Sequence, residues 1–221
     1  LNLNYTKFKN LFQPKECVKS SGIEYEEGLS HHDKSIEFNA HQSGGRIVKF
    51  DNDHVLFSLG DFRLRSHAQS KESSLGKIIK ININTSEYEI ISIGHRNVQG
   101  LLYDKKNNFI LSTEHGPHGG DEINLDLDPI SETKNFGWAI ASYGEHYGGK
   151  DSEKNKDKYK KYPLHKSHKK YGFIEPLKSF SPSIGISEII YVKKNKNEYL
   201  NNSLIVSSLR ASSIYVLQLN E

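Results

Sequence analysis

Short apolar stretches separated by polar turns run through most of the chain. The clearest cover residues 46–50, 55–59, 77–83 and 87–93, and each is rich in β-branched residues and bounded by Gly, Asn or Asp. Several alternate apolar and polar positions with the period of two that is typical of a half-buried strand. No long segment has the 3.6-residue period of an amphipathic helix. The pattern therefore predicts an all-β protein.

The predicted strands recur in a repeated unit. Residues 45–60, 100–116 and 185–209 each contain an apolar strand, a polar turn and a second apolar strand, and a further strand follows each one. Four-stranded units repeated about every 50 residues are typical of β-propeller blades, with a solenoid or a stacked sandwich as the alternative. The loops of about ten or more residues between units favour the propeller. At this spacing the chain supplies about four blades.

Composition and charge narrow the function classes. Of the 221 residues, 35% are hydrophobic and 26% charged, which is typical of a soluble globular protein with one large domain. No apolar run approaches the roughly 18 residues of a membrane span, so no span is expected. The formal net charge of +3 is too small to indicate a nucleic-acid partner. The densest basic stretch, residues 150–170, also contains acidic and polar residues and is interpreted as a solvated surface insertion.

The cysteine content limits disulfides and metal sites, and the first residue bears on processing of the chain. Cys17 is the single cysteine, which excludes an internal disulfide and a cysteine-cluster metal site. The chain begins at Leu1 and contains no methionine, so we expect an internal fragment or a processed chain. The lack of a signal peptide at its start therefore does not argue against secretion.

Polar residues gather where predicted strands begin or end, which is where β proteins usually build sites. His41 lies in a Gly-rich turn ahead of a strand and can titrate near neutrality, as a general base must, although a plain surface role is the alternative. Arg96 and Asn97 follow the strand at 87–93. The guanidinium suits a carboxylate ligand, with a salt bridge inside the loop as the alternative. Most of the 11 histidines are interpreted as ordinary surface residues, among them His31, His32, His146, His165 and His168.

Residues 114–122, with the sequence EHGPHGGDE, have the composition of a cation-binding turn. The Gly-Pro and Gly-Gly pairs force a tight backbone that can point several carbonyl oxygens at one place, and Asp121 and Glu122 add carboxylates. Such oxygen ligands suit Ca²⁺, with a plain structural turn as the alternative. His115 and His118 also suggest zinc, but no convincing third ligand stands near them in the sequence.

Six motifs in the same order resemble those of the soluble sugar dehydrogenases that use pyrroloquinoline quinone (PQQ), the glucose/sorbosone and aldose sugar dehydrogenase family. The most specific are GHRNVQG at residues 94–100 and EHGPHGGDE at 114–122. The others are HQSGGR at 41–46, LGKIIKIN at 75–82, NFGW through SYGEHY at 135–147 and PSIGIS at 182–187. The resemblance covers about residues 40–215 and implies a six-bladed β-propeller, of which this chain holds a part.

The resemblance implies roles in proton transfer and cofactor binding. His41 matches the base that takes the proton of the sugar C1 hydroxyl. Contacts to PQQ are implied for Arg96 and Asn97, for Tyr147, and for Arg210, which stands where the family usually has a lysine. The implied reaction oxidises the C1 hydroxyl of an aldose to a lactone, and the electrons pass to an external acceptor. A periplasmic or secreted location is implied as well.

The resemblance also implies two calcium positions. The backbone carbonyls of Gly116 and Pro117 match those that hold the catalytic Ca²⁺ against the quinone, where the ion acts as a Lewis acid. Glu122 and the carbonyl of Phe136 match a second calcium position in aldose-type members. Phe136 replaces the family's usual tyrosine, which changes nothing where only the carbonyl binds.

Two rival functions stay open. One is a non-catalytic propeller that keeps calcium for structure and binds a protein or glycan partner, since fold does not fix function. The other is a calcium lactonase, which the lack of a clear nucleophile-and-base set disfavours. The joint presence of base, cofactor and calcium residues favours the dehydrogenase. Residues 11–39 do not align with the family, and the isolated chain is expected to be inactive because the pocket needs further blades.

Overall fold

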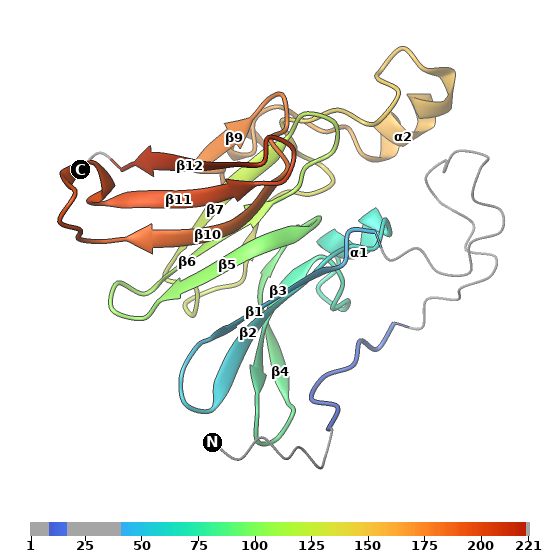
Figure 1. Cartoon of the computed structure of the whole chain (residues 1–221). Helices are drawn as coiled ribbons and strands as arrows, with labels where there is room; N and C mark the ends of the chain where they lie inside the picture. The colour runs from blue at the N-terminus through green and yellow to red at the C-terminus, as the bar shows by residue number, and fades with distance from the viewer. Residues whose placement is uncertain (1–8, 17–40, 220–221) are drawn as a thin grey trace.

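The computed structural model describes residues 9–16 and 41–219, which form three sheets stacked one against the next (Figure 1). The helices are short. They comprise α1 (Arg65–Gln69), α2 (Lys156–Lys161) and the 3₁₀ turns η1 (Glu153–Asn155), η2 (Lys169–Tyr171) and η3 (Glu198–Leu200). The all-β prediction is therefore confirmed. Within the described ranges, no helix is both long and apolar enough to cross a membrane.

The first sheet has five strands in the order β1-β2-β3-β4-β8. They are β1 (Gly44–Lys49), β2 (His54–Leu59), β3 (Lys77–Asn82), β4 (Tyr88–Ile93) and β8 (Lys134–Asn135). The four strands that the apolar pattern predicts all form, with bounds shifted by at most two residues. The short strand β8 comes from much later in the chain and pairs with β4 in parallel.

The second and third sheets repeat the antiparallel pattern. The second has the order β5-β6-β7-β9, with β5 (Val98–Asp104), β6 (Phe109–Glu114), β7 (Asp121–Leu127) and β9 (Lys178–Phe180). The third has the order β10-β11-β12, with β10 (Ile186–Val192), β11 (Ser203–Ser208) and β12 (Ser213–Gln218). The strand-turn-strand-strand repeat in the sequence thus corresponds to β1–β3, β5–β7 and β10–β12.

The predicted count of about four four-stranded blades is not confirmed. The described residues form three sheets of five, four and three strands, and these do not close into a ring. The difference arises between β7 and β10. Residues 128–185 do not build a sheet of their own, because their short strands β8 and β9 complete the first and second sheets.

Apolar side chains fill the two spaces between neighbouring sheets. In the described chain, β1 packs against β5, and β10 packs against β5 and β6. One buried cluster joins the first and second sheets and comprises Phe50, Leu56, Ile78, Ile91, Leu101 and Ile110. A second joins the second and third sheets and comprises Leu111, Ile123, Ile186, Ile189, Leu204 and Val206. Ile110 and Leu111 are consecutive on β6 and point to opposite faces, so this strand is buried on both sides.

The segment 9–16 attaches to the outside of the first sheet. The Phe12 ring meets Phe57 and Tyr88 edge-on, with centroid distances of 6.0 and 5.1 Å. The carboxylate of Glu16 accepts hydrogen bonds from the Ser74 amide at 2.7 Å and from the Ser73 hydroxyl at 2.6 Å. Part of the segment that the motifs leave unaligned thus has a defined place, while residues 17–40 lie outside the described ranges.

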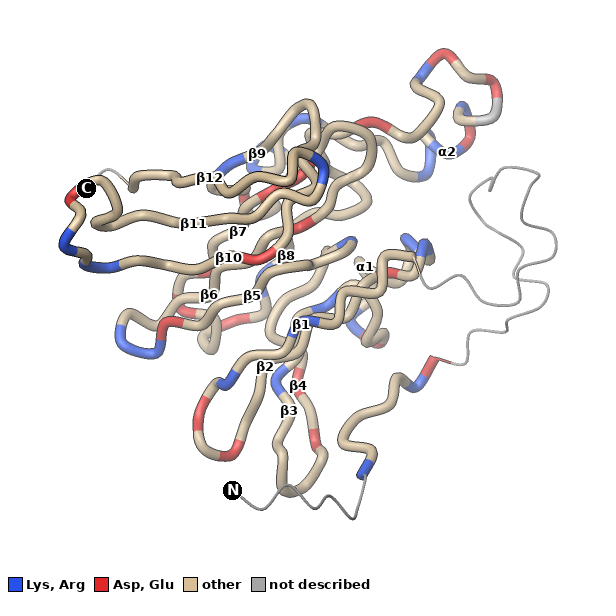
Figure 2. The backbone as a smooth tube through the Cα atoms, in the orientation of Figure 1, with Lys and Arg blue, Asp and Glu red and all other residues tan. Residues whose placement is uncertain are grey.

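Residues 150–170 combine an exposed charged face with buried anchors. Lysines and acidic residues alternate around α2 (Figure 2). Tyr162 and Leu164 are nevertheless buried, and they pack with Trp138 and Ala139 into a third apolar cluster. The surface-insertion interpretation stays a prediction, but the segment is fixed to the body of the protein by these side chains.

Candidate functional site

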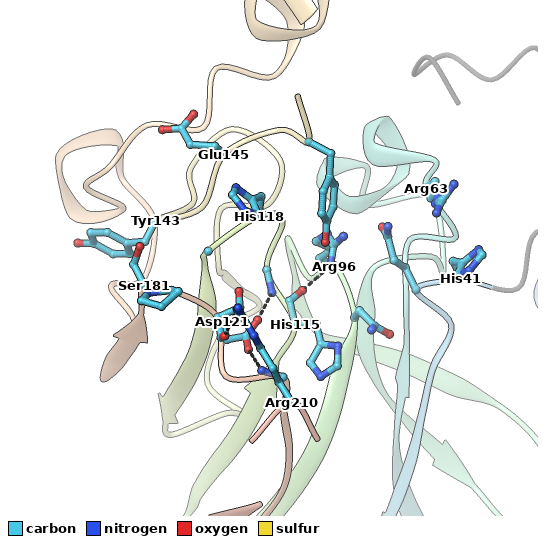
Figure 3. Close-up of a pocket in the computed structure, with 18 residues that line it drawn as sticks. His41, Arg63, Arg96, His115, His118, Asp121, Tyr143, Glu145, Ser181 and Arg210 are labelled. Atoms are coloured by element: carbon cyan, nitrogen blue, oxygen red, sulfur yellow. Dashed lines mark hydrogen bonds between the residues drawn. The ribbon is translucent and has the colours of Figure 1, made fainter. Parts of the chain in front are cut away.

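An open pocket of about 990 Å³ lies at one end of the three sheets. Residues just before the first strand of each sheet line it: His41 before β1, Arg96 before β5 and Gly185 before β10. Residues just after the second strand line it too: Arg63 after β2, His115 after β6 and Arg210 after β11. In an antiparallel pair the start of one strand lies beside the end of the next. The repeated topology therefore gathers these side chains around one space (Figure 3).

The pocket favours an anionic ligand. Three arginines line it: Arg63, Arg96 and Arg210. The two carboxylates in its wall already have internal partners. Asp121 accepts from the Gly185 amide at 2.7 Å, and Glu145 pairs with Lys166 at 2.8 Å and accepts from the Tyr159 hydroxyl at 2.5 Å. Neither carboxylate forms an ion pair with one of the three arginines.

A tight turn places His41 at the pocket. A Cβ at Gly60 would lie 1.8 Å from the Gln42 carbonyl oxygen, so the segment entering β1 lies directly on the end of β2. Gly44 has a φ of 66° and donates its amide to Asn97 Oδ1 at 3.1 Å, which ties the first sheet to the second. The exposed His41 is held on the side of the pocket that also carries Arg63 (Figure 3).

Arg96 connects the pocket to the protein interior. It is 5% exposed, its Nη1 donates to the His115 carbonyl at 2.7 Å, and its guanidinium lies 5.4 Å from the centroid of the Trp138 ring. Burial lowers the pKa of Arg96, and the negative charge of Asp61 works in the opposite direction. Its buried Nε has no hydrogen-bond partner among the described residues. Such an orphaned donor is a suitable contact for a bound anion.

Behind the pocket lies a group of buried polar residues that we call the inner cluster: Asp61, His95, Glu114 and Trp138. Trp138 Nε1 donates to Asp61 Oδ2 at 2.7 Å. The Gln42 amide, oriented to satisfy both neighbours, donates to Asp61 Oδ1 at 2.7 Å and accepts from Arg96 Nη2 at 3.0 Å. Burial raises the pKa of Asp61 to about 6, while Arg96 and Trp138 limit the rise.

The other carboxylate of the inner cluster orders the loop that carries Arg96. Glu114 accepts the Arg96 amide on one oxygen and His95 Nδ1, at 2.9 Å, on the other. His95 is fully buried, bonds Ser92 Oγ through Nε2 at 2.8 Å and stacks on Phe136 at 4.8 Å. Glu114 therefore helps to hold the backbone of the loop that carries His95 and Arg96 in its conformation.

Six of the predicted site residues line the open pocket together: His41, Arg96, Asn97, Gly116, Tyr147 and Arg210. Pro117 is buried beside Gly116, and its carbonyl accepts only a long bond of 3.3 Å from the Gly120 amide. Glu122 and Phe136 lie behind the pocket, next to Gly116 at a small buried void. Asp121 and Glu122 do not converge on one point, because consecutive residues of β7 point to opposite faces of the sheet.

Two histidines interpreted as surface residues are buried. His146 and His168 are each only 1% exposed, so that interpretation is wrong for them, whereas His31 and His32 lie outside the described ranges. His168 Nε2 lies 3.4 Å from Glu122 Oε1. Burial works to lower the pKa of His168, but the contact with Glu122 outweighs it and raises this pKa overall.

Residues 150–170 support the loop that carries Tyr147. Asn155 donates to the Tyr147 carbonyl at 3.0 Å, and the Tyr159 hydroxyl accepts from the His146 amide at 3.0 Å. The Tyr147 side chain is 67% exposed, and its ring lies 5.9 Å from that of His118. Residues 150–170, which the sequence analysis interprets as a surface insertion, therefore position part of the pocket wall.

Sequence reasoning missed several residues of the site. They are Asp61, Arg63, Tyr143 and Glu145 in or beside the pocket, and His168 behind it. For Arg63 a signal existed, because it follows the second strand of its unit as Arg210 does. Among residues 9–16 and 41–219, no group of three or more His, Cys, Asp or Glu could hold a metal ion.

Comparisons with known proteins find relatives among the sugar dehydrogenases. The family model described as Glucose / Sorbosone dehydrogenase matches residues 18–221, so the prediction that residues 11–39 do not align with the family is wrong for residues 18–39. The chain is 27% identical to the aldose sugar dehydrogenase YliI of Escherichia coli over 190 residues, which is 80% of this chain and 47% of that protein. It is 29% identical to quinoprotein glucose dehydrogenase B of Acinetobacter calcoaceticus over 139 residues, which is 49% of this chain and 28% of that protein.

Solved structures give the same result for the fold. The apo form of the soluble aldose sugar dehydrogenase of Escherichia coli superposes with a TM-score of 0.64 at 26% identity, over 80% of this chain and 51% of that one. The chain thus spans about half the length of this relative, and less of the quinoprotein.

Proposed function

The chain belongs to the glucose/sorbosone dehydrogenase family, and on that premise we propose that it is part of a quinoprotein that oxidises the C1 hydroxyl of aldose sugars to lactones. One observation carries the proposal. The matching residues His41, Arg96, Asn97, Gly116, Tyr147 and Arg210 come from separate sheets and loops and line a single pocket. A quinoprotein glucose dehydrogenase among the relatives supports the cofactor class.

The pocket residues fit PQQ. PQQ is a planar anion with three carboxylates, and the pocket offers three arginines together with the orphaned Nε of Arg96. The Asn97 side-chain oxygen already accepts from the Gly44 amide at 3.1 Å and from Gln99 Nε2 at 3.0 Å. Its NH₂ group is therefore the part of Asn97 that we assign to the cofactor. Tyr147 offers an exposed ring at the edge of the same pocket.

Calcium fits the turn at Gly116 and Pro117 through backbone oxygens. The Pro117 carbonyl is only weakly engaged at 3.3 Å, and carbonyl oxygens are ligands that Ca²⁺ accepts. Asp121 stays out of this ligand set because its oxygens face the amides of Gly116, Gly185 and Ile186. PQQ held by the arginines would supply a hydride acceptor, and Ca²⁺ held by the Gly116 and Pro117 carbonyls would supply Lewis-acid polarisation of it.

His41 would act as the general base. Its exposed imidazole lines the pocket, where it can take the proton of the C1 hydroxyl as the hydride leaves C1. Arg96 and Arg210 would hold the carboxylates of the cofactor and so fix its distance from His41. We further propose a periplasmic or secreted location and an external electron acceptor.

The test is reconstitution of the protein as the cell makes it. The metal-free protein is loaded with PQQ and Ca²⁺, and oxidation of a broad panel of aldoses is followed with an artificial dye acceptor. The proposal expects lactone formation that depends on both PQQ and Ca²⁺. Bound PQQ without oxidation of any aldose rejects the enzyme, and failure to bind PQQ favours the non-catalytic propeller that binds a protein or glycan partner.

A further inference from the structure

We infer that the substrate of this site is an acidic aldose, whose carboxylate or phosphate group binds Arg63 while its C1 hydroxyl faces His41. The inference rests on the proposed function and adds the substrate class to it. It starts from a difference among the three arginines of the pocket. Arg96 and Arg210 are assigned to the carboxylates of the cofactor. Arg63 lies instead on the side of the pocket that carries His41 (Figure 3).

The turn that carries Arg63 has an unusual backbone. Phe62 and Arg63 have φ values of 49° and 67°, in the left-handed region that residues with a side chain seldom adopt. The buried carboxylate of Asp61 holds the turn, because it accepts the Arg63 amide at 2.9 Å. Strained backbone of this kind persists where the surrounding structure enforces it, and it gathers at functional sites. Here the strained turn places Arg63 in the pocket wall.

Two backbone hydrogen bonds connect this turn to the rest of the site. The Phe62 amide donates to the carbonyl of Gln42, the residue after His41, at 3.2 Å. The Asp61 amide donates to the Arg96 carbonyl at 3.0 Å. The backbone that carries the guanidinium is therefore fixed relative to both the proposed base and an arginine assigned to the cofactor.

The half-buried guanidinium of Arg63 has no hydrogen-bond or ion-pair partner among residues 9–16 and 41–219. The two carboxylates of the pocket wall have other partners, since Asp121 accepts backbone amides and Glu145 pairs with Lys166. A planar guanidinium whose donors are not used inside the protein suits a carboxylate or a phosphate. The ligand that fits Arg63 is therefore an anion.

A second cation lies near Arg63. Burial lowers the pKa of Lys158, and the positive charges of Arg65 and Arg63 lower it further. Lys158 belongs to α2, and Tyr162 at the end of α2 shares an apolar cluster with Ala68 of α1. Like charges held close together repel each other, and an anion bound beside them offsets that repulsion. The side of the pocket that carries the base thus has more positive charge than one arginine supplies.

An acidic aldose matches this distribution of charge. A neutral sugar offers only hydroxyl groups to Arg63 and Lys158, and these do not offset the two charges. A uronic acid or a sugar phosphate keeps the C1 hydroxyl that the proposed reaction needs and adds an anion elsewhere on the sugar. Both acids form charge-assisted hydrogen bonds with a guanidinium, and the test separates them.

The first test compares glucuronate, glucose 6-phosphate and glucose, which differ only in the group at C6. The protein as the cell makes it is loaded with PQQ and Ca²⁺, and kcat/KM is measured for each sugar at constant ionic strength. We expect at least one acid to exceed glucose by about tenfold or more, as for one additional charge-assisted hydrogen bond. The better acid identifies the anionic group. Glucose oxidised as efficiently as both acids overturns the inference and leaves the proposed function intact.

Substitution then assigns the preference to Arg63. In Arg63→Gln, the ratio of kcat/KM for the better acid to that for glucose should fall by about tenfold. Arg210→Gln is the matched control, because it should weaken PQQ binding and keep this ratio. An unchanged ratio in Arg63→Gln contradicts the inference. So does a loss of PQQ affinity in Arg63→Gln as large as that in Arg210→Gln, since Arg63 would then be a cofactor ligand.

Binding without turnover separates the inference from the proposed function. Isothermal titration of the calcium-loaded, PQQ-free protein with each of the three sugars measures affinity alone. The better acid should bind more tightly than glucose, and Arg63→Gln should weaken it by about tenfold. A protein that oxidises no aldose but shows this binding loses the proposed reaction and keeps the ligand class. Equal affinity of wild type and Arg63→Gln for both acids overturns the ligand class itself.

Discussion

The open pocket and the inner cluster share some of their motifs but differ in how far their polar groups are engaged. In the pocket, the Nε of Arg96 has no hydrogen-bond partner among the described residues. In the inner cluster, both carboxylates are engaged: Asp61 binds Trp138 and Gln42, and Glu114 binds the Arg96 amide and His95. The site therefore contains two kinds of residue, those whose side chains line the pocket and those that hold the first kind in place.

Neighbours in the sequence separate into these two kinds. His95 is fully buried in the inner cluster, and Arg96 beside it reaches the pocket. Asp121 lines the pocket wall, while Glu122 on the opposite face of β7 contacts His168 behind it. Substitutions in the pocket should therefore change ligand binding or rate, and substitutions in the inner cluster should change stability.

The largest effect is expected from His41→Ala, a pocket change. In the protein reconstituted with PQQ and Ca²⁺, the turnover of aldoses should fall by roughly 10²–10⁴ because the base is removed. Cofactor affinity should stay close to that of wild type, since Arg96 and the calcium provide most of the charge complementarity. Turnover at saturating sugar and PQQ is the measurement, and a variant with wild-type turnover removes His41 from the mechanism.

Asp61→Asn tests the inner cluster through pH. Burial raises the pKa of Asp61 from 3.8 to about 6, so the folded protein binds this proton more tightly than the unfolded chain does. Protonated Asp61 therefore contributes fully to the free energy of unfolding below about pH 4. This contribution, about 3 kcal/mol, is lost as the pH rises through about 6.

The Asn variant lacks this titration, so its free energy of unfolding should fall less between pH 4 and pH 6.5. Urea unfolding across that range provides the comparison, with the exposed Asp53→Asn as the control. Identical pH profiles for Asp61→Asn and wild type contradict the assignment.

Glu114→Gln should have a smaller effect. Glutamine has one acceptor oxygen where the carboxylate has two, so either the Arg96 amide or His95 Nδ1 loses its acceptor. The expected loss is about 1–3 kcal/mol of unfolding free energy. Glu132→Gln is the control, because that side chain is 76% exposed and should change stability by less than about 0.5 kcal/mol. Equal losses in the two variants would show that Glu114 does not order the loop.

The strands were predictable where local pattern decides. Apolar residues dominate positions 77–83, which form β3. The consecutive apolar residues Ile110 and Leu111 fit a strand that is buried on both faces. The strands β8 and β9 have two and three residues and no pattern, and both join sheets built by other parts of the chain. Such pairing depends on tertiary placement, which explains why the blade count was not predictable.

The pocket residues were predictable from motifs, but their supporting partners were not. Arg96 and Asn97 stand in a specific motif, and the structure places both in the pocket. Asp61 and His168 have no distinctive local sequence, since their role depends on a tryptophan 77 residues later and a carbonyl 32 residues earlier. Burial of His168 within a lysine-rich stretch is a tertiary property that composition does not reveal.

Titration of PQQ into the calcium-loaded protein tests the central claim most directly, namely that the gathered cations form a quinone site. The account predicts saturable one-to-one binding to wild type. Arg96→Ala and Arg210→Ala should each weaken Kd by about tenfold or more, as expected for a lost charge-assisted hydrogen bond, while His41→Ala should not. Wild type that does not bind PQQ, or arginine variants that bind it as tightly as wild type, would contradict the claim.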